Sequence, residues 1–255
     1  MKKQSTAILA SVLLVLTALV LGSLVQYAFY VRDGAEIVLP GSDIDPQGPA
    51  TDIAVQNKEL LETLTVDRTN IALLLRNLVR PDVYHWEGRV TLSGGGTTGQ
   101  TMVSADAEGG KLRVSLRQGS STNIEEYLLT DRTYYTWARG ESGYYSGKRG
   151  DFTGPQIMMA ATCEELLQLP QEAFQDASIL WDGDQECLAI TVLDPVSGYR
   201  MEYRIAVRDG MLISMEAFDG TRGVYRVERL ILETGVVRIG AFVLPDGSQP
   251  DAGVQ

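Results

Sequence analysis

Residues 201–218, MEYRIAVRDGMLISMEAF, decide the fold class because their apolar side chains recur at every second position. Tyr203 and Ile205, for example, alternate with Glu202 and Arg204. Side chains of a β-strand point alternately to its two faces, so the pattern predicts strands with one buried and one wet face. Antiparallel sheets show this alternation, whereas strands of parallel sheets are usually continuous apolar runs. We therefore expect an antiparallel sheet.

The same period of two occurs on both sides of this stretch, at residues 84–92, 112–116 and 188–192. Short turns rich in glycine and aspartate separate the alternating segments at hairpin spacing. These turns are Gly109-Gly110, Asp131-Arg132, Asp194 to Gly198, Asp209-Gly210 and Asp219-Gly220. The chain is thus predicted to form a meander of long hairpins.

Two parts of the sequence have helical periodicity instead. Residues 57–64 and 67–78 precede the strands, and the second stretch carries apolar residues at helical spacing before Pro81. Residues 154–174 predict a helical excursion midway along the chain. The expected fold is therefore mainly β with helices (α+β): a curved antiparallel sheet, or half-open barrel, with an N-terminal helix and a mid-chain helical insertion.

The N-terminal run from residue 6 to residue 30, TAILASVLLVLTALVLGSLVQYAFY, contains no charged residue. It exceeds the roughly 20 residues needed to cross a hydrocarbon core of about 30 Å. Lys2 and Lys3 precede it, which predicts a cytoplasmic N-terminus and an extracytoplasmic C-terminal domain. We expect a single-pass anchor in the cell membrane. The alternative is a cleaved signal peptide, whose apolar region normally has only about 7–15 residues.

The expected organisation has four parts. Residues 1–32 form a cytoplasmic tip and transmembrane anchor, and residues 33–55, rich in glycine and proline, form a flexible linker. Residues 56–247 form the ectodomain, and residues 248–255 a C-terminal tail. All acidic residues follow Tyr30, and the whole chain carries a net charge of −11. Because phosphate backbones repel such a chain, we expect no nucleic-acid partner.

Two short motifs suggest a family. The hairpin Tyr127-Leu128-Leu129-Thr130-Asp131-Arg132-Thr133-Tyr134-Tyr135-Thr136-Trp137 resembles a strand, turn and aromatic strand of the bacterial outer-membrane lipoprotein carriers and receptors, the LolA/LolB superfamily. Phe242-Val243-Leu244-Pro245 is similar to that family's closing Phe-x-x-Pro. Arg132 departs from the family, which usually has glycine there. The resemblance covers residues 57–245 and implies a half-open barrel with an apolar concave face suited to a lipid or acyl chain.

We find no catalytic, cofactor-binding or metal-binding motif in the sequence. His85 is the one histidine, and no nucleophile motif such as G-x-S-x-G accompanies it. The two cysteines, Cys163 and Cys187, have neither C-x-x-C spacing nor a histidine motif beside them. No metal, no cofactor and no enzymatic activity are therefore predicted.

The same two cysteines form an even pair in a domain expected on the oxidising side of the membrane. A disulfide would fasten the helical insertion to the strand that starts at Cys187. The alternative is two buried free thiols, which behave as small hydrophobic side chains. Both interpretations remain open from the sequence.

Methionine and tryptophan side chains fit irregular apolar ligands, so several of them are candidates to line a ligand cavity. The alternative is that they are ordinary core residues. The candidate cavity residues are Trp86, Trp137, Met159, Leu166, Met201 and Met215.

Two functions follow from this architecture. The first is a membrane-tethered extracytoplasmic protein of the bacterial envelope that binds a lipid, a lipoprotein acyl chain or another hydrophobic ligand. The second is a noncatalytic interaction or regulatory ectodomain that binds an envelope protein, which an exposed apolar sheet edge would favour. A hydrolase is disfavoured because no catalytic site is assembled in the sequence.

Overall fold

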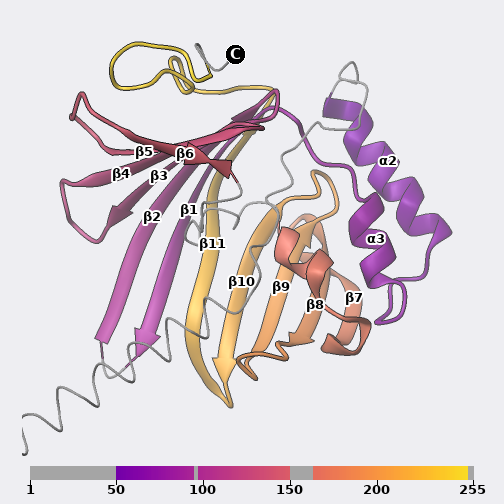
Figure 1. Cartoon of the computed structure of the whole chain (residues 1–255). Coiled ribbons are helices and arrows are strands. Elements are labelled where there is room, and N and C mark those ends of the chain that lie inside the picture. The colour runs from indigo at the N-terminus through magenta and orange to yellow at the C-terminus, as the bar shows by residue number, and fades with distance from the viewer. Residues whose placement is uncertain (1–49, 95–96, 150–162, 252–255) are drawn as a thin grey trace, which may run out of the picture. The chain divides into compact units, whose positions relative to one another are not determined.

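The computed structural model describes residues 50–94, 97–149 and 163–251. In these ranges eleven antiparallel strands form one sheet in the order β6-β5-β4-β3-β2-β1-β11-β10-β9-β8-β7 (Figure 1). The strands are β1 (Tyr84–Gly94), β2 (Thr97–Glu108), β3 (Lys111–Gln118), β4 (Ile124–Leu129), β5 (Thr133–Ala138), β6 (Tyr145–Lys148), β7 (Phe174–Asp182), β8 (Gln185–Leu193), β9 (Arg200–Ala206), β10 (Leu212–Asp219) and β11 (Arg222–Thr234).

Strand β1 lies in the middle of this sheet. Strands β2 to β6 follow it on one side, and β11 back to β7 on the other, so that the sheet consists of two meanders. They join where β1 pairs with β11, from Tyr84 opposite Thr234 to Leu92 opposite Tyr225. The predicted meander of antiparallel hairpins is confirmed.

The predicted α+β fold class is wrong. The described residues form one large sheet with only two short α-helices, α2 (Ala50–Thr63) and α3 (Ile71–Asn77). Where the mid-chain helical insertion was expected, the described part contains two 3₁₀ turns, η3 (Glu164–Gln168) and η4 (Gln171–Ala173). A regular helix cannot pass through Cys163, whose φ of 55° is left-handed. Residues 154–162 of that prediction lie outside the described residues.

The predicted transmembrane anchor and the single-pass membrane localisation also need correction. Within the described ranges, no helix combines the length and the apolar character that a bilayer crossing requires. Helix α2, the longer of the two described α-helices, has 14 residues, fewer than the roughly 20 that a span requires. The apolar run at residues 6–30 lies outside the described residues.

The hydrophobic core lies on one face of the sheet, which we call the inner face. It is the face against which α3 and η3 pack, and its buried side chains extend from Tyr134 of β5 to Phe174 of β7. Helix α3 contributes Ile71, Leu74 and Leu75, the apolar stripe expected from the sequence. The alternation that predicted half-buried strands thus places one set of side chains in this core.

Helix α2 is attached to the sheet by a buried asparagine. The amide nitrogen of Asn57 donates to the carbonyl oxygens of Val79 and Val207, at 2.9 Å each, and its Oδ1 accepts from the Val79 N–H at 2.7 Å. All three bonds connect α2 to residues far along the chain. They fix α2 beside the end of β9.

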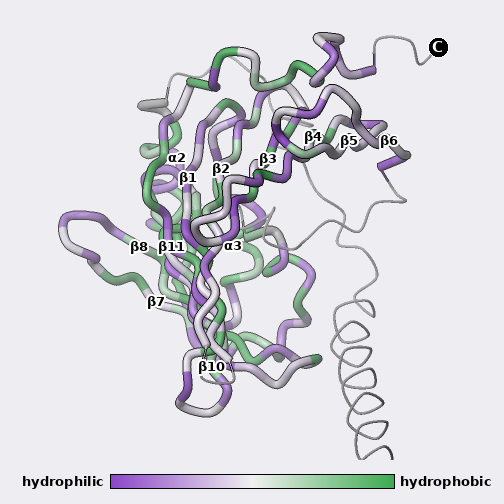
Figure 2. Tube along the Cα trace, turned by 90° about the vertical axis from the view of Figure 1, so that its left-hand side faces the viewer, coloured by the Kyte–Doolittle hydropathy of each residue, from purple (hydrophilic) through white to green (hydrophobic). Residues whose placement is uncertain are grey.

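The opposite face, the outer face, carries a C-terminal strap formed by residues 235–251. In both views this segment lies beside β3 to β5 (Figure 1, Figure 2). Arg238 donates to Asp106 at 2.6 and 2.7 Å, and Arg113 donates to the carbonyl oxygen of Ala241 at 2.8 Å. Leu244 packs in a second cluster with Leu128, Tyr135 and Trp137. Ionic and apolar contacts together therefore hold the strap.

Candidate functional site

The inner face is the candidate site, and Trp86 lies at its centre. This residue is on the middle strand, β1, and its side chain is fully buried. Its cross-strand neighbours are Ala105 of β2 and Leu232 of β11. The surroundings of the ring are therefore apolar, with a small residue on one side.

Gly88 explains how the Trp86 ring lies against the sheet. The two residues are two positions apart on β1, so they face the same side. A Cβ atom added at Gly88 would be only 2.0 Å from Cη2 of Trp86. The ring thus covers Gly88, and any larger residue there would displace it.

The indole N–H of Trp86 has no hydrogen-bond partner among the described residues, although the side chain is buried. Tryptophan N–H groups usually find a partner when they are buried. Leaving a buried donor unsatisfied costs about 1–3 kcal/mol. The inner face therefore presents an unused donor within an apolar cluster.

A second polar feature of the inner face joins η3 to β9. The hydroxyl of Tyr203 donates to Oε1 of Glu165 at 3.4 Å. Burial, followed by the negative charge of Glu165, raises the pKa of Tyr225 well above its ordinary value. Both tyrosines belong to, or pack against, the inner core cluster. The charged group beside these two tyrosines, Glu165, is therefore negative.

Tyr127 of β4 makes a similar pair. Its hydroxyl donates to Oε2 of Glu125 at 2.9 Å. Burial, the hydrogen bond to Glu125 and the charge of that carboxylate raise the pKa of Tyr127 to about 12. The phenol therefore keeps its proton to a higher pH than an ordinary tyrosine does.

Four of the six predicted cavity residues meet on the inner face. Trp86, Leu166 and Met215 are buried members of one cluster, and Met201 packs against it. Trp137 lies on the outer face, stacked under the guanidinium of Arg113 at 5.1 Å from its ring centroid. Met159 lies outside the described residues. Whether the four line a ligand cavity stays a prediction.

Sequence reasoning missed the polar residues of this face. Alternation does place Tyr203 with Ile205 on the buried side, but nothing local indicates its contact with Glu165, 38 residues earlier. The unpartnered N–H of Trp86 is equally invisible in the sequence, because it depends on neighbours from two other strands.

Cys163 and Cys187 are both buried thiols in the structure, and no disulfide joins these two described residues. Cys163 belongs to the inner cluster, as do Leu188 and Ile190 of β8. Because side chains alternate along a strand, Cys187 points to the outer face. Burial, followed by the charge of Asp182, raises the pKa of the Cys187 thiol. The sheet therefore stands between the two sulfur atoms.

His85 lies on the outer face and is held by two carboxylates. Its Nδ1 is 2.9 Å from Asp106, and its Nε2 is 3.3 Å from Glu87. Both ring nitrogens therefore face acidic side chains and not a hydroxyl or thiol nucleophile. Among the described residues, no group of three or more histidine, cysteine or acidic side chains could hold a metal ion.

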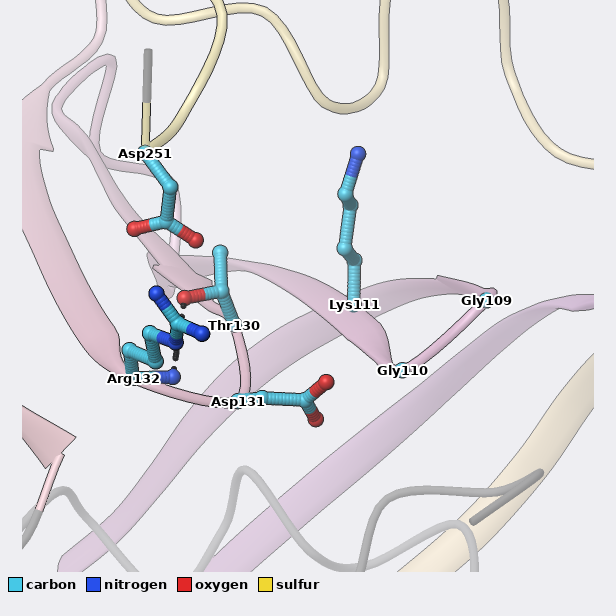
Figure 3. A pocket seen from close by; sticks show the side chains of 7 residues that line it. All are labelled: Gly109, Gly110, Lys111, Thr130, Asp131, Arg132 and Asp251. Carbon is cyan, nitrogen blue, oxygen red and sulfur yellow. Dashed lines mark hydrogen bonds between the residues drawn. The ribbon is translucent and has the colours of Figure 1, made fainter. Parts of the chain in front are cut away.

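A small polar pocket lies where the β2–β3 and β4–β5 turns approach the end of the strap (Figure 3). Its volume of about 160 Å³ is below the roughly 300–1,000 Å³ of typical ligand sites. It is lined by residues of both charges, including Lys111, Asp131, Arg132 and Asp251. The size and polarity of this pocket do not suit an acyl chain.

The edge strand β7 exposes large apolar side chains. Among the described strands it pairs with β8 alone, at the end of the sheet. Trp181 is 67% exposed and Ile179 is 39% exposed. An open edge with apolar side chains is a surface to which another strand can add.

The comparisons with known proteins find matches among solved structures. No family model and no curated protein matches the sequence. A conserved uncharacterized protein from Thermus thermophilus is 8% identical with a TM-score of 0.43, and the match covers 72% of this chain and 90% of that chain. LprF from Mycobacterium bovis is 13% identical with a TM-score of 0.38, and the match covers 77% of this chain and 98% of that chain. A LolA superfamily protein from Nitrosomonas europaea is 8% identical with a TM-score of 0.32, and the match covers 74% of this chain and 97% of that chain.

Proposed function

We propose that this chain binds a lipid, an acyl chain or another hydrophobic ligand on its inner face. The observation that carries the proposal is the continuous apolar lining of this face, which extends from Tyr134 of β5 to Phe174 of β7. Eleven strands spaced about 4.8 Å apart extend over roughly 50 Å. Helix α3, with 7 residues, is only about 10 Å long, and α2, with 14, about 21 Å. These two helices alone do not account for the burial of the face, whose core side chains are all buried.

The composition of the face suits such a ligand. Its buried residues are mostly aliphatic and aromatic, with Met201 and Met215 as adaptable side chains. Apolar ligand sites combine such a lining with a few polar groups that orient the ligand. Trp86 Nε1 and the Glu165–Tyr203 pair are polar groups of this kind. The function inferred is binding and not catalysis.

A titration of the full chain with the neutral apolar probe N-phenyl-1-naphthylamine tests this proposal. We expect saturable fluorescence enhancement that an acylglycerol displaces. Ala105→Phe adds bulk beside Trp86, where the probe would bind, and should weaken probe binding roughly tenfold, which corresponds to about 1.4 kcal/mol. Ser214→Phe places the same ring on the outer face, opposite Arg204 and Glu228, and should leave binding unchanged. A folded wild-type protein without saturable binding would refute the proposal.

We infer a second candidate function from the edge of the sheet, which is the docking of an extended segment from a protein partner. The supporting observation is the exposure of Trp181 and Ile179 on β7. Strand addition takes its affinity from main-chain hydrogen bonds and its specificity from alternate side chains.

Site-specific photo-crosslinking in the native cell tests this second function. A photoreactive residue at position 181 should give one discrete adduct. The same residue at position 216, on β10 in the interior of the sheet, serves as the control and should give none. Equal adducts at both positions, or none at position 181, would count against docking at β7.

A further inference from the structure

The two edges of the described sheet differ in how open they are to another strand. The edge strand β6 has only 4 residues and includes Lys148, and both features discourage strand addition. The other edge strand, β7, has 9 residues and contains no lysine, proline or glycine (Figure 1). Its exposed Ile179 and Trp181 alternate in phase with the core residue Ala177, so they point to the inner side. The edge at β7 is therefore the one suited to strand addition.

The outer side of β7 carries negative charge. Asp176 and Asp182 point to this side, and both are exposed. Asp182 pairs with Arg204 of β9 at 3.0 Å, whereas Asp176 has no ionic partner in the described part of the chain. Residues 171–186 contain five acidic residues and no basic residue. A strand that adds to β7 therefore meets apolar side chains on one side and negative charge on the other.

These charges act against a second copy of the chain as the added strand. Asp176 and Asp182 lie equally far from Ile179, on either side of it. When two copies of β7 pair antiparallel with Ile179 opposite Ile179, each Asp176 lies opposite an Asp182. Like charges directly opposite each other destabilise a strand pair. The edge thus disfavours its own sequence and favours a strand with positive charge at these two positions.

We propose that β7 binds an extended protein segment with lysine or arginine on one side and apolar residues on the other. The basic residues lie opposite Asp176 and Asp182, and the apolar residues pack on Ile179 and Trp181. Main-chain hydrogen bonds supply the affinity, and the side chains on both sides supply the specificity. This inference rests on the proposed docking of a protein segment at β7 and names the chemistry of that segment.

Two peptides with blocked ends test this proposal on the full chain. Lys-Val-Thr-Val-Thr-Val-Lys places its central valine opposite Ile179 and its two lysines opposite Asp176 and Asp182. Glu-Val-Thr-Val-Thr-Val-Glu is the matched peptide of opposite charge. In about 0.1 M salt we expect the lysine peptide to bind roughly tenfold more tightly, because two attractive pairs replace two repulsive ones. In about 1 M salt the preference should largely disappear, since charges are then screened within about 3 Å.

Acrylamide quenching of tryptophan fluorescence shows whether the peptide binds at β7. Trp181 is exposed, whereas Trp86 and Trp137 are buried, so the quencher reaches mainly Trp181. A peptide on β7 should shield Trp181 and reduce quenching in a saturable way. A peptide bound elsewhere would leave quenching unchanged.

Asp176→Asn removes one of the two charges and should lower the preference to roughly threefold. Asp219→Asn, in an exposed pair with Arg222 at the β10–β11 turn, is the matched control and should keep the full preference. Equal shielding of Trp181 by both peptides, or an unchanged preference in Asp176→Asn, would overturn this inference while docking at β7 stands. Shielding by neither peptide would also overturn it, and the photo-crosslink at position 181 then decides separately whether any segment docks there.

Discussion

At the scale of single residues, Gly88 determines the position of Trp86. The added Cβ of Gly88→Ala would lie 2.0 Å from the buried indole ring. We expect a loss of roughly 1–3 kcal/mol in unfolding free energy, as for other overpacked cores. Urea denaturation measures this loss. Gly94→Ala is the control on the same strand, with no described atom within 4 Å of the added Cβ, and it should change stability little. Equal losses in both variants would show that the ring does not depend on Gly88.

Asp106 should make stability depend on acid pH. Its burial acts to raise its pKa, but the hydrogen bonds and charge of Arg238, together with the charge of His85, outweigh burial and lower it. The unfolded state, with a pKa of about 3.9, therefore takes up the proton first. The ionised carboxylate stabilises the fold above about pH 4, and this contribution is lost as the pH falls through the folded-state pKa.

Asp106→Asn should remove that part of the acid sensitivity. At about pH 6 we expect a loss of roughly 1–3 kcal/mol, because a partner of Arg238 is removed from a buried network. Near pH 2 the variant and the wild type should converge. Asp219→Asn affects an exposed pair with Arg222 and should cost under about 1 kcal/mol. Urea midpoints across this pH range measure both variants, and a constant gap between Asp106→Asn and the wild type would contradict the account.

At the scale of elements, the strap is held by its apolar end as well as by Arg238. Leu244 is 4% exposed, whereas Ile239 of the same strap is fully exposed. Leu244→Ala should cost roughly 2–3 kcal/mol, the lower part of the range for core leucines. It should also speed hydrogen exchange in residues 235–251, while Ile239→Ala should have no effect on either quantity. Unchanged exchange in the Leu244 variant would mean that the strap does not need this contact.

The state of the two cysteines follows from the elements that hold them. Because η3 and β8 place Cys163 and Cys187 on opposite sides of the sheet, the thiols should remain unlinked and protected. Mass mapping with and without reductant should give the same mass. Alkylation should require denaturant for both. A disulfide-linked peptide pair recovered from the native protein would contradict this arrangement.

Local periodicity predicted the elements that depend on neighbouring residues. Alternation correctly assigned Tyr203 and Ile205 to the buried side and Arg204 to the wet side, because strand geometry is a local property. Alternation along β5 also separates Trp137 from the inner-face residue Tyr134, and the sequence interpretation overlooked this. The expected helix around residues 154–174 failed in its described part because Cys163 adopts a left-handed conformation.

The strap could not be predicted from local patterns. Arg238 binds Asp106 across 132 positions of sequence, and Arg113 binds Ala241 across 128. Tertiary contacts at such separations leave no periodic signal. The Phe242-to-Pro245 motif lies within the strap, and its residues Phe242 and Leu244 pack against the outer face.

At the scale of the whole molecule, the account depends on the inner face receiving a hydrophobic ligand. The two meanders joined at β1 and β11 create this face, and α3 and η3 pack on it. The outer face differs, because the strap contacts β2 to β5 and exposed ion pairs such as Arg204–Asp182 lie elsewhere on the sheet. The inner face is therefore the one suited to an apolar ligand.

Mass spectrometry of organic extracts from the purified full chain tests this central claim most directly. Asp106→Asn, which is altered on the outer face, serves as a control for adventitious lipid loss. We predict an acylated lipid that co-purifies in stoichiometric amount with the wild type and with this control, and that is depleted in Ala105→Phe. A folded wild-type protein that yields no lipid and takes up none from acylglycerol micelles would contradict the account.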